Sequence, residues 1–328
     1  MRRYVILALA LGGCFSGPPY DGAASDHFDG RRFRNEVPGE RGPLDVVEWQ
    51  LRGRERGPWP EWTDAAPGAP PPARVDGGRL RVTFVNHATA LVQMDGVNIL
   101  TDPVWSDGVG PLPFGQVPRR RPPGIRFEDL PPIDAVVVSH DHYDHLDLPT
   151  LERLAAVHHP RIFVGLGNRA LLERNGVAGG VDLDWWERSD LTERVRITAV
   201  PARHASMRAL GDRDETLWCG WVISGPSGSV YFAGDTGFGP HFEEIRARCG
   251  APRLALLPIG AYKPRWFMEP MHMSPDDAVR AHVALGAATS LGVHFGTFAL
   301  GDESELDPVA DLARALAREA EVQGAICP

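Results

Sequence analysis

A regular pattern of apolar and polar positions begins near Arg79 and continues toward the end of the chain. The segment from Leu80 to Asn86 is predicted to be a strand, and Asp95-Gly96 further along is typical of a hairpin turn. The run from Ala135 to Val138 is apolar at every position, which indicates a strand buried on both faces. Further strands are predicted at 90–94, 97–101, 161–165, 195–200, 221–224, 230–233, 254–258 and 290–294.

Helices are predicted between several of these strands. The segment from Leu148 to Val157 has a proline at its second position and apolar residues on one face. Ser274 followed by Pro275 and two aspartates is a typical helix start, because serine caps backbone amides and proline suits the first turn. Asp307-Pro308 repeats this arrangement. Hairpins followed by strands that alternate with helices predict an α/β fold in which helices cover the sheets.

The first residues are predicted to be an export signal. Arg2 and Arg3 precede an apolar run that is much shorter than the ~20 residues needed to span a bilayer. The sequence Leu11-Gly12-Gly13-Cys14 resembles the bacterial lipobox, in which the peptide is cut before a cysteine that receives lipid. These features predict a signal peptide at 1–13, lipidation at Cys14, and an exported bacterial lipoprotein of the outer membrane or cell envelope.

Residues 14–78 differ in composition from the rest of the chain. Proline, glycine, arginine and tryptophan are common there, and no long strand or helix pattern appears. The segment is therefore predicted to be a lipidated arm and linker that precedes one domain at 79–328. Trp49, Trp59 and Trp62 indicate that parts of the arm pack on an apolar surface, either the domain or the membrane.

The formal net charge of the 328-residue chain is −9. A general nucleic-acid-binding protein needs a dominant basic surface, so this charge predicts that nucleic acid is not a partner. The composition makes no prediction of the oligomeric state.

A cluster of metal-ligating residue types follows the buried strand at 135–138. His140, His142, Asp144 and His145 lie within six residues, where a loop after the strand can surround a metal ion. Histidine supplies neutral nitrogen and aspartate supplies oxygen, a mixture that suits Zn²⁺. The H-x-H-x-D-H pattern after a strand therefore predicts a metal site.

Three further candidates lie at or just past the ends of predicted strands. They are His204, Asp235 and His294, and open sheets gather their functional loops at such positions. Together with the loop residues they make seven candidate ligands, too many for one tetrahedral site. The sequence therefore predicts two metal ions, with zinc preferred and iron or manganese as alternatives.

These motifs resemble the metallo-β-lactamase superfamily and, more narrowly, the N-acylphosphatidylethanolamine-hydrolysing phospholipase D family and its bacterial relatives. The resemblance runs from about residue 27 to about residue 303. The matching stretches, besides the ligand motifs, include His27 to Asn35, Asn86-His87-Ala88-Thr89, Leu100 to Ser106, Arg119 to Pro123, Thr216 to Trp218, Gly260 to Tyr262, Pro264 to Met268 and His294 to Phe298.

The resemblance implies an αββα sandwich with two metal ions at one edge. His140, His142 and His204 would hold the first ion, Asp144, His145 and His294 would hold the second, and Asp235 would bridge them. His272 matches a family position near the substrate, where it would contact substrate or donate a proton, although a structural role is the alternative. The chain departs from the common family pattern at Ala205, Lys263 and Phe295.

The implied activity is hydrolysis of a phosphodiester, with N-acylated phospholipids as the suggested substrates and a membrane surface as the partner of the lipid anchor. Arg119, Arg120, Arg121 and Arg265 are candidate contacts for the phosphate, with a solvated loop as the alternative for the first three. A lactonase or other ester hydrolase on the same fold is a second hypothesis. A non-catalytic zinc-binding surface lipoprotein is a third, and the complete ligand set argues against it.

Overall fold

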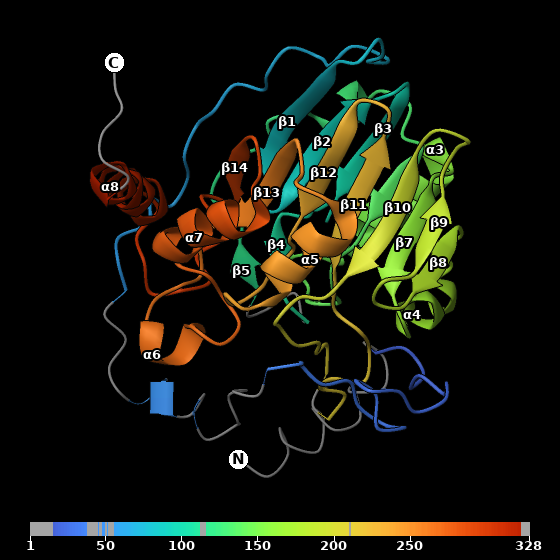
Figure 1. Cartoon of the computed structure of the whole chain (residues 1–328), viewed down its shortest axis with the longest axis horizontal. Helices are drawn as coiled ribbons and strands as arrows, with labels where there is room; N and C mark the ends of the chain where they lie inside the picture. Colours follow the sequence, from blue (N-terminus) through green and yellow to red (C-terminus); the bar gives the residue numbers. More distant parts are fainter. Residues whose placement is uncertain are drawn as a thin grey trace.

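Two six-stranded sheets face each other, and helices cover their outer faces (Figure 1). The structure is a computed structural model, and it describes residues 16–37, 45, 48–49, 51, 56–111, 116–209 and 211–322. The predicted signal peptide at 1–13 and the predicted lipidation site Cys14 lie outside the described residues. None of the helices in the described part of the chain combines the length and the hydropathy needed to cross a membrane.

The first sheet has the strand order β1-β2-β3-β6-β7-β8. Its strands are β1 (Leu80–Asn86), β2 (Thr89–Met94), β3 (Val97–Thr101), β6 (Ala135–Val137), β7 (Arg161–Gly165) and β8 (Gly180–Leu183). β1, β2 and β3 pair antiparallel, whereas β3, β6, β7 and β8 pair parallel. β1, β3, β6, β7 and β8 therefore all run in the same direction.

The second sheet has the strand order β14-β13-β12-β11-β10-β9. Its strands are β9 (Arg188–Asp190), β10 (Arg196–Val200), β11 (Gly220–Gly225), β12 (Gly228–Phe232), β13 (Leu254–Pro258) and β14 (Ser290–Val293). β12, β13 and β14 pair parallel, and β10 runs the same way because β11 lies antiparallel to both β10 and β12. A separate small ribbon joins β4 (Gly108–Val109) to β5 (Val117–Pro118).

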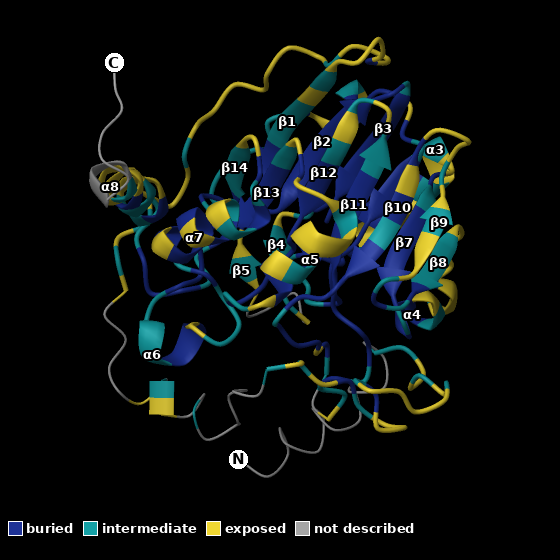
Figure 2. Ribbon diagram, viewed as in Figure 1, coloured by how far each residue is buried: buried dark blue, intermediate teal, exposed yellow. Residues whose placement is uncertain are grey.

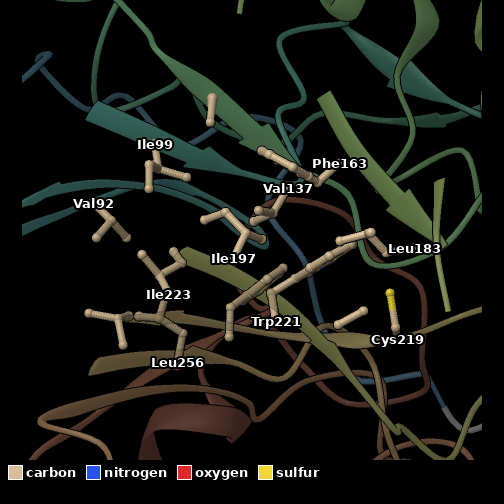
Figure 3. Close-up of a cluster of buried hydrophobic side chains, with 14 of the residues drawn as sticks. Val92, Ile99, Val137, Phe163, Leu183, Ile197, Cys219, Trp221, Ile223 and Leu256 are labelled. Carbon is tan, nitrogen blue, oxygen red and sulfur yellow. The ribbon is translucent and has the colours of Figure 1, made fainter. Parts of the chain in front are cut away.

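Three clusters of buried apolar side chains correspond to the three interfaces between four layers. Figure 3 shows the central cluster, in which Ile99 and Val137 of the first sheet meet Ile197 and Trp221 of the second. A second cluster packs α3 (Leu148–His158) and α4 (Asn168–Arg174) on the outer face of the first sheet. A third packs α5 (His241–Cys249) and α7 (Pro275–Leu285) on the second sheet. Most positions along the facing strands are accordingly buried (Figure 2). The predicted αββα sandwich is confirmed.

The helices are η1 (Phe127–Asp129), α3 (Leu148–His158), α4 (Asn168–Arg174), α5 (His241–Cys249), α6 (Arg265–Met268), α7 (Pro275–Leu285) and α8 (Asp307–Val322). They lie between strands, except for α8, which follows the last strand β14. The predicted start of α7 is confirmed: the Ser274 side chain accepts the Asp277 backbone N–H, and the Asp277 side chain accepts the Ser274 N–H in return.

The described part of the N-terminal arm packs on the domain. Phe28 and Phe33 are each 2% exposed and belong to the central core between the sheets. Trp59 donates its indole N–H to the backbone oxygen of Glu303, 2.9 Å away. The apolar surface that these parts of the arm contact is therefore the domain itself.

Candidate metal centre

The predicted ligands converge on one edge of the sandwich because strands that run in the same direction end there. In the first sheet, β1 leads into His87 and β6 leads into the loop that begins at Ser139. In the second sheet, His204 follows β10, Asp235 follows β12 and His294 follows β14. Asp102, which follows β3, lies at this edge as well. Loops from six strand ends can therefore surround a common point.

Several of these residues turn the chain sharply where a strand ends. His87, Asp102 and His294 have φ angles of 44°, 33° and 61°, in the left-handed region that residues other than glycine rarely adopt. The backbone N–H of His294 donates to the oxygen of His87 over 2.7 Å, which joins the ends of the two sheets. Such strain is typical of functional sites, where the surrounding structure enforces it.

One group of ligands consists of His140, His142 and His204. Nδ1 of His142 lies 2.8 Å from Nε2 of His140 and 3.3 Å from Nε2 of His204. The three rings face one another edge to face, with ring centroids 4.4 to 5.1 Å apart. Three imidazole nitrogens can therefore bind one ion from three sides.

A second group consists of Asp144, His145 and His294, and His87 joins it. Oδ2 of Asp144 lies 3.2 Å from Nε2 of His145, 3.4 Å from Nε2 of His294 and 2.9 Å from Nε2 of His87. His87 is buried and directed at the same oxygen as the two predicted ligands. This group therefore holds one more imidazole than the sequence analysis assigned to the metal centre.

Asp235 lies between the two groups. Its Oδ2 is 3.0 Å from Nε2 of His294, 3.3 Å from Nε2 of His145 and 4.0 Å from Nε2 of His204. The preceding Gly234 has a φ of 60°, and a Cβ there would lie 2.3 Å from the Ser139 side chain, so only glycine fits. This close approach brings the end of β12 against the loop after β6, as a bridging carboxylate requires.

Further polar residues fix the orientation of the ligands. Oδ2 of the buried Asp102 lies 2.6 Å from Nδ1 of His145. The Asp102 carboxylate also accepts hydrogen bonds from the backbone N–H and the hydroxyl of Ser139. Asn35, from the N-terminal arm, accepts the backbone N–H of His204 and donates to the His204 backbone oxygen. A carboxylate behind a ligating histidine directs its other ring nitrogen toward the metal.

The electrostatics of the cluster follow from burial and from its two carboxylates. Burial opposes protonation of His294, but Asp235 and Asp144 raise its pKa to about 9. Burial also opposes ionisation of Asp235, but His294 and His145 hold its pKa well below the ordinary value. Burial lowers the pKa of His87 to about 3, so that imidazole is neutral at pH 7. Without a metal ion, the two carboxylates thus hold a proton on His294 at neutral pH. A metal ion would bind this imidazole by displacing that proton, because histidine ligates metal in its neutral form.

The donor atoms meet the requirements of a dinuclear site. Within each overlapping subset of the cluster, one nitrogen or oxygen per residue lies within 4.8 Å of the others. Nε2 of His145, Nε2 of His294 and Oδ1 of Asp235 are buried in the described structure without a hydrogen-bond partner. Buried polar atoms normally have a partner, so these unsatisfied atoms fit metal ligands. Nitrogen and carboxylate donors suit zinc, and iron and manganese also accept them.

His272 lies beside Asp235 and is one of the partly exposed members of this cluster. Its Nδ1 is 3.6 Å from Oδ2 of Asp235, and its side chain is 14% exposed. Burial lowers its pKa to about 4, so the ring is neutral at pH 7. Arg265 supports this segment by donating to the backbone oxygen of His272 and to the carboxylate of Asp277. The position is compatible with the predicted contact with substrate.

The four predicted substrate-binding arginines already have protein partners. Arg119 is 4% exposed and donates to the backbone oxygens of Ser106 and Val104, and Arg265 makes the contacts described above. Arg120 donates to the backbone oxygen of Glu61, and Arg121 pairs with Glu305. The burial of Arg119 gives it a role in holding its loop, and contact of these arginines with a phosphate stays a prediction.

Neither His87 nor Asp102 was among the predicted ligands. Both stand directly after a strand, in Asn86-His87 and in Thr101-Asp102, which is the same signal that identified His204 and His294. Of the departures from the common family pattern, Lys263 pairs with Asp307, and Phe295 stacks on Phe84.

Comparison with known proteins agrees with this geometry. The family model described as a β-lactamase superfamily domain matches residues 97–295. An N-acyl-phosphatidylethanolamine-hydrolyzing phospholipase D of Caenorhabditis elegans is 41% identical over 241 residues, which cover 70% of this chain and 67% of that protein. An uncharacterised protein of Mycobacterium tuberculosis is 40% identical over 284 residues, covering 84% of this chain and 74% of its own length.

Among solved structures, the metallo hydrolase Igni18 of Ignicoccus hospitalis superposes with a TM-score of 0.55 at 23% identity, covering 72% of this chain and 91% of its own. This likeness concerns the fold, whereas the match at 97–295 spans more than half of the sequence. The chain therefore belongs to the β-lactamase superfamily, among the metal-dependent hydrolases of the metallo-β-lactamase fold.

Proposed function

We propose that the protein is a dinuclear zinc hydrolase that cleaves a phosphodiester bond in N-acylated phospholipids or related lipids. The observation that carries this proposal is the position of Asp235, whose Oδ2 lies within 4.0 Å of histidines from both ligand groups. A carboxylate placed in this way could be shared by two metal ions. Two zinc ions in such a site supply Lewis acidity and a nucleophilic water at neutral pH.

The residues of the chain have distinct parts in this proposal. Asp102 fixes the ring of His145, and His87 orients the carboxylate of Asp144, so the ligands keep their geometry during turnover. His272 is neutral at pH 7 and lies beside Asp235 with its side chain partly exposed, where it can transfer a proton to or from the reacting oxygens. No serine or cysteine nucleophile is needed for this chemistry.

The substrate class rests on similarity in sequence. The relative from Caenorhabditis elegans carries a name that states hydrolysis of N-acyl-phosphatidylethanolamine, and it matches 70% of this chain. The resemblance also includes segments outside the ligand motifs, among them Gly260 to Tyr262 and Pro264 to Met268. These segments favour a phospholipid over a lactone, because they resemble the phospholipase family more than they resemble lactonases.

The substrate proposal is tested by comparing kcat/KM for an N-acylated phospholipid, a small phosphodiester and an acyl lactone on one metal-replete preparation. We expect the phosphodiesters to exceed the lactone by at least tenfold, equivalent to about 1.4 kcal/mol of transition-state preference. The same assays on Asp235→Asn show whether each hydrolysis comes from this centre. A lactone preferred by tenfold or more would replace the phosphodiesterase assignment with the ester-hydrolase alternative.

We also propose that Cys14 carries lipid and anchors the protein to a membrane of the cell envelope. The basis is the sequence Leu11-Gly12-Gly13-Cys14. In the expressing bacterium, Cys14→Ser is expected to abolish labelling by a radioactive or clickable fatty acid and to release the protein from the membrane fraction. Cys249→Ser is the matched control and should keep both properties. Wild-type protein that sediments with membranes without any label would contradict lipidation.

A further inference from the structure

A buried arginine connects the two loops that carry the first group of ligands. Arg208 is 6% exposed and lies four residues after His204. Its Nη1 donates to the backbone oxygen of Asp141 over 2.6 Å and to the backbone oxygen of Leu146 over 3.0 Å. These two oxygens lie at the two ends of the segment that contains His142, Asp144 and His145. One guanidinium therefore holds both ends of the ligand loop.

Tyr143, in the middle of that loop, contacts the same arginine. The guanidinium carbon of Arg208 lies 4.0 Å from the centre of the Tyr143 ring, a cation–π contact. The Tyr143 hydroxyl donates to the backbone oxygen of Arg208 over 2.8 Å. The ligand loop thus contacts both the side chain and the backbone of Arg208.

The side chain of Asp141, which belongs to the ligand loop, accepts two hydrogen bonds from the segments that follow His204. Its Oδ1 accepts the backbone N–H of Met207 over 2.9 Å, and its Oδ2 accepts the hydroxyl of Thr216 over 3.1 Å. Asp141 itself stands between the ligands His140 and His142. Residues 207, 208 and 216 are therefore joined to the ligand loop by hydrogen bonds donated from both sides.

We propose that Arg208 is a positioning residue for metal binding, which sets the distance between His204 and the His140–His142 pair. These ligands belong to loops of different sheets, and one metal ion needs all three nitrogens at the same point. A buried guanidinium is costly unless its donors are satisfied, so it keeps the carbonyls of Asp141 and Leu146 in a fixed place. The inference rests on the proposed dinuclear metal site.

The test measures zinc affinity directly, by competition with a chromophoric chelator, for wild type and for Arg208→Met. Outer contacts of a metal site change metal affinity by about 10- to 100-fold, and we expect a loss of that size in one of the two sites. Arg208→Lys should recover part of the affinity, because an ammonium can reach one carbonyl but cannot span both. Excess zinc should restore much of the kcat of Arg208→Met.

The matched control is Arg119→Met. Arg119 is also buried, also donates to two backbone oxygens and also lies beside an aromatic ring, that of Phe298. It holds residues 104 and 106, which are not predicted ligands. We expect this variant to unfold at a lower temperature while keeping wild-type zinc affinity. The comparison separates metal positioning from a general loss of stability.

Thr216→Val provides a milder test that keeps the fold if Arg208→Met does not. It removes one hydroxyl bond to Asp141 and should weaken zinc binding about 2- to 10-fold. If wild type binds two zinc ions and both Arg208→Lys and Thr216→Val bind them with unchanged affinity, the positioning role is wrong and the metal centre stands. If wild type binds no zinc, the proposed function is wrong as well.

Discussion

Replacing Asp235 with asparagine is expected to lower kcat/KM for the preferred phosphodiester on the order of a thousandfold. The amide keeps the shape of the side chain but loses the negative charge that holds two cations against their mutual repulsion. Metal ions supply several kcal/mol of transition-state stabilisation, and each 1.4 kcal/mol is a factor of ten, so loss of one ion gives an effect of about this size. Metal analysis of the same preparation should show fewer than two ions per chain.

Asp95→Asn is the matched control for this substitution. Asp95 is also a buried carboxylate, but it lies in the turn between β2 and β3, where it accepts the N–H and the hydroxyl of Ser227. This variant should keep two ions and near-wild-type activity. Far-ultraviolet circular dichroism should show that Asp235→Asn is folded. Full activity of Asp235→Asn would mean that this carboxylate does not bridge the ions.

Removal of the metal is expected to abolish hydrolysis and to lower the free energy of unfolding. An ion that binds only the folded chain stabilises it by about 4 kcal/mol when its concentration is 1,000 times its dissociation constant. The metal-free protein should therefore unfold at a lower urea concentration than the zinc-loaded protein. Activity should return as zinc is added, and it should reach its maximum at two ions per chain.

His158→Gln serves as the control for metal stoichiometry. His158 ends α3 and lies outside the subsets of the metal cluster, so this variant should still bind two ions. The clearest contradictory result would be a chain that binds fewer than one ion after reloading. Equal unfolding curves with and without zinc would also contradict the expected linkage between metal binding and folding.

Elements with a strong local pattern could be predicted from the sequence. β6 is an uninterrupted apolar run, and its strand is predicted to within one residue. α7 begins with a capping serine and a proline, so the start of this helix is predicted as well. β9 is a short polar strand at a sheet edge, Arg188–Asp190, and it shows no apolar alternation. α5 begins after Pro240, which makes no side-chain cap, so its start carries no capping signal. The sequence analysis therefore predicted neither β9 nor α5.

In the candidate site, the ligands could be predicted from the sequence, but the residues that orient them could not. His140, His142, Asp144 and His145 could be found because they are adjacent in sequence, and His204, Asp235 and His294 because each follows a strand. The contacts that orient them are long-range. Asp102 meets His145 across 43 positions, and Asn35 meets His204 across 169 positions. Such partners follow from the way the two sheets pack, which a local pattern does not contain.

If Cys14 carries the proposed lipid, the docked arm limits the distance between the domain and the membrane. Gly17 lies so close to the backbone of Leu171 in α4 that a Cβ there would be 3.0 Å from it, and the Tyr20 side chain lies against Gly167, just before that helix. Cys14 lies three positions before Gly17, a reach of at most about 11 Å even in a fully extended chain. With lipid on Cys14, the protein would rest on the bilayer rather than extend into the aqueous phase.

Gly167 follows the end of β7, so the contact would involve the same edge of the sandwich that gathers the ligands. A lipid head group could then reach the centre by moving sideways from the bilayer, without leaving it.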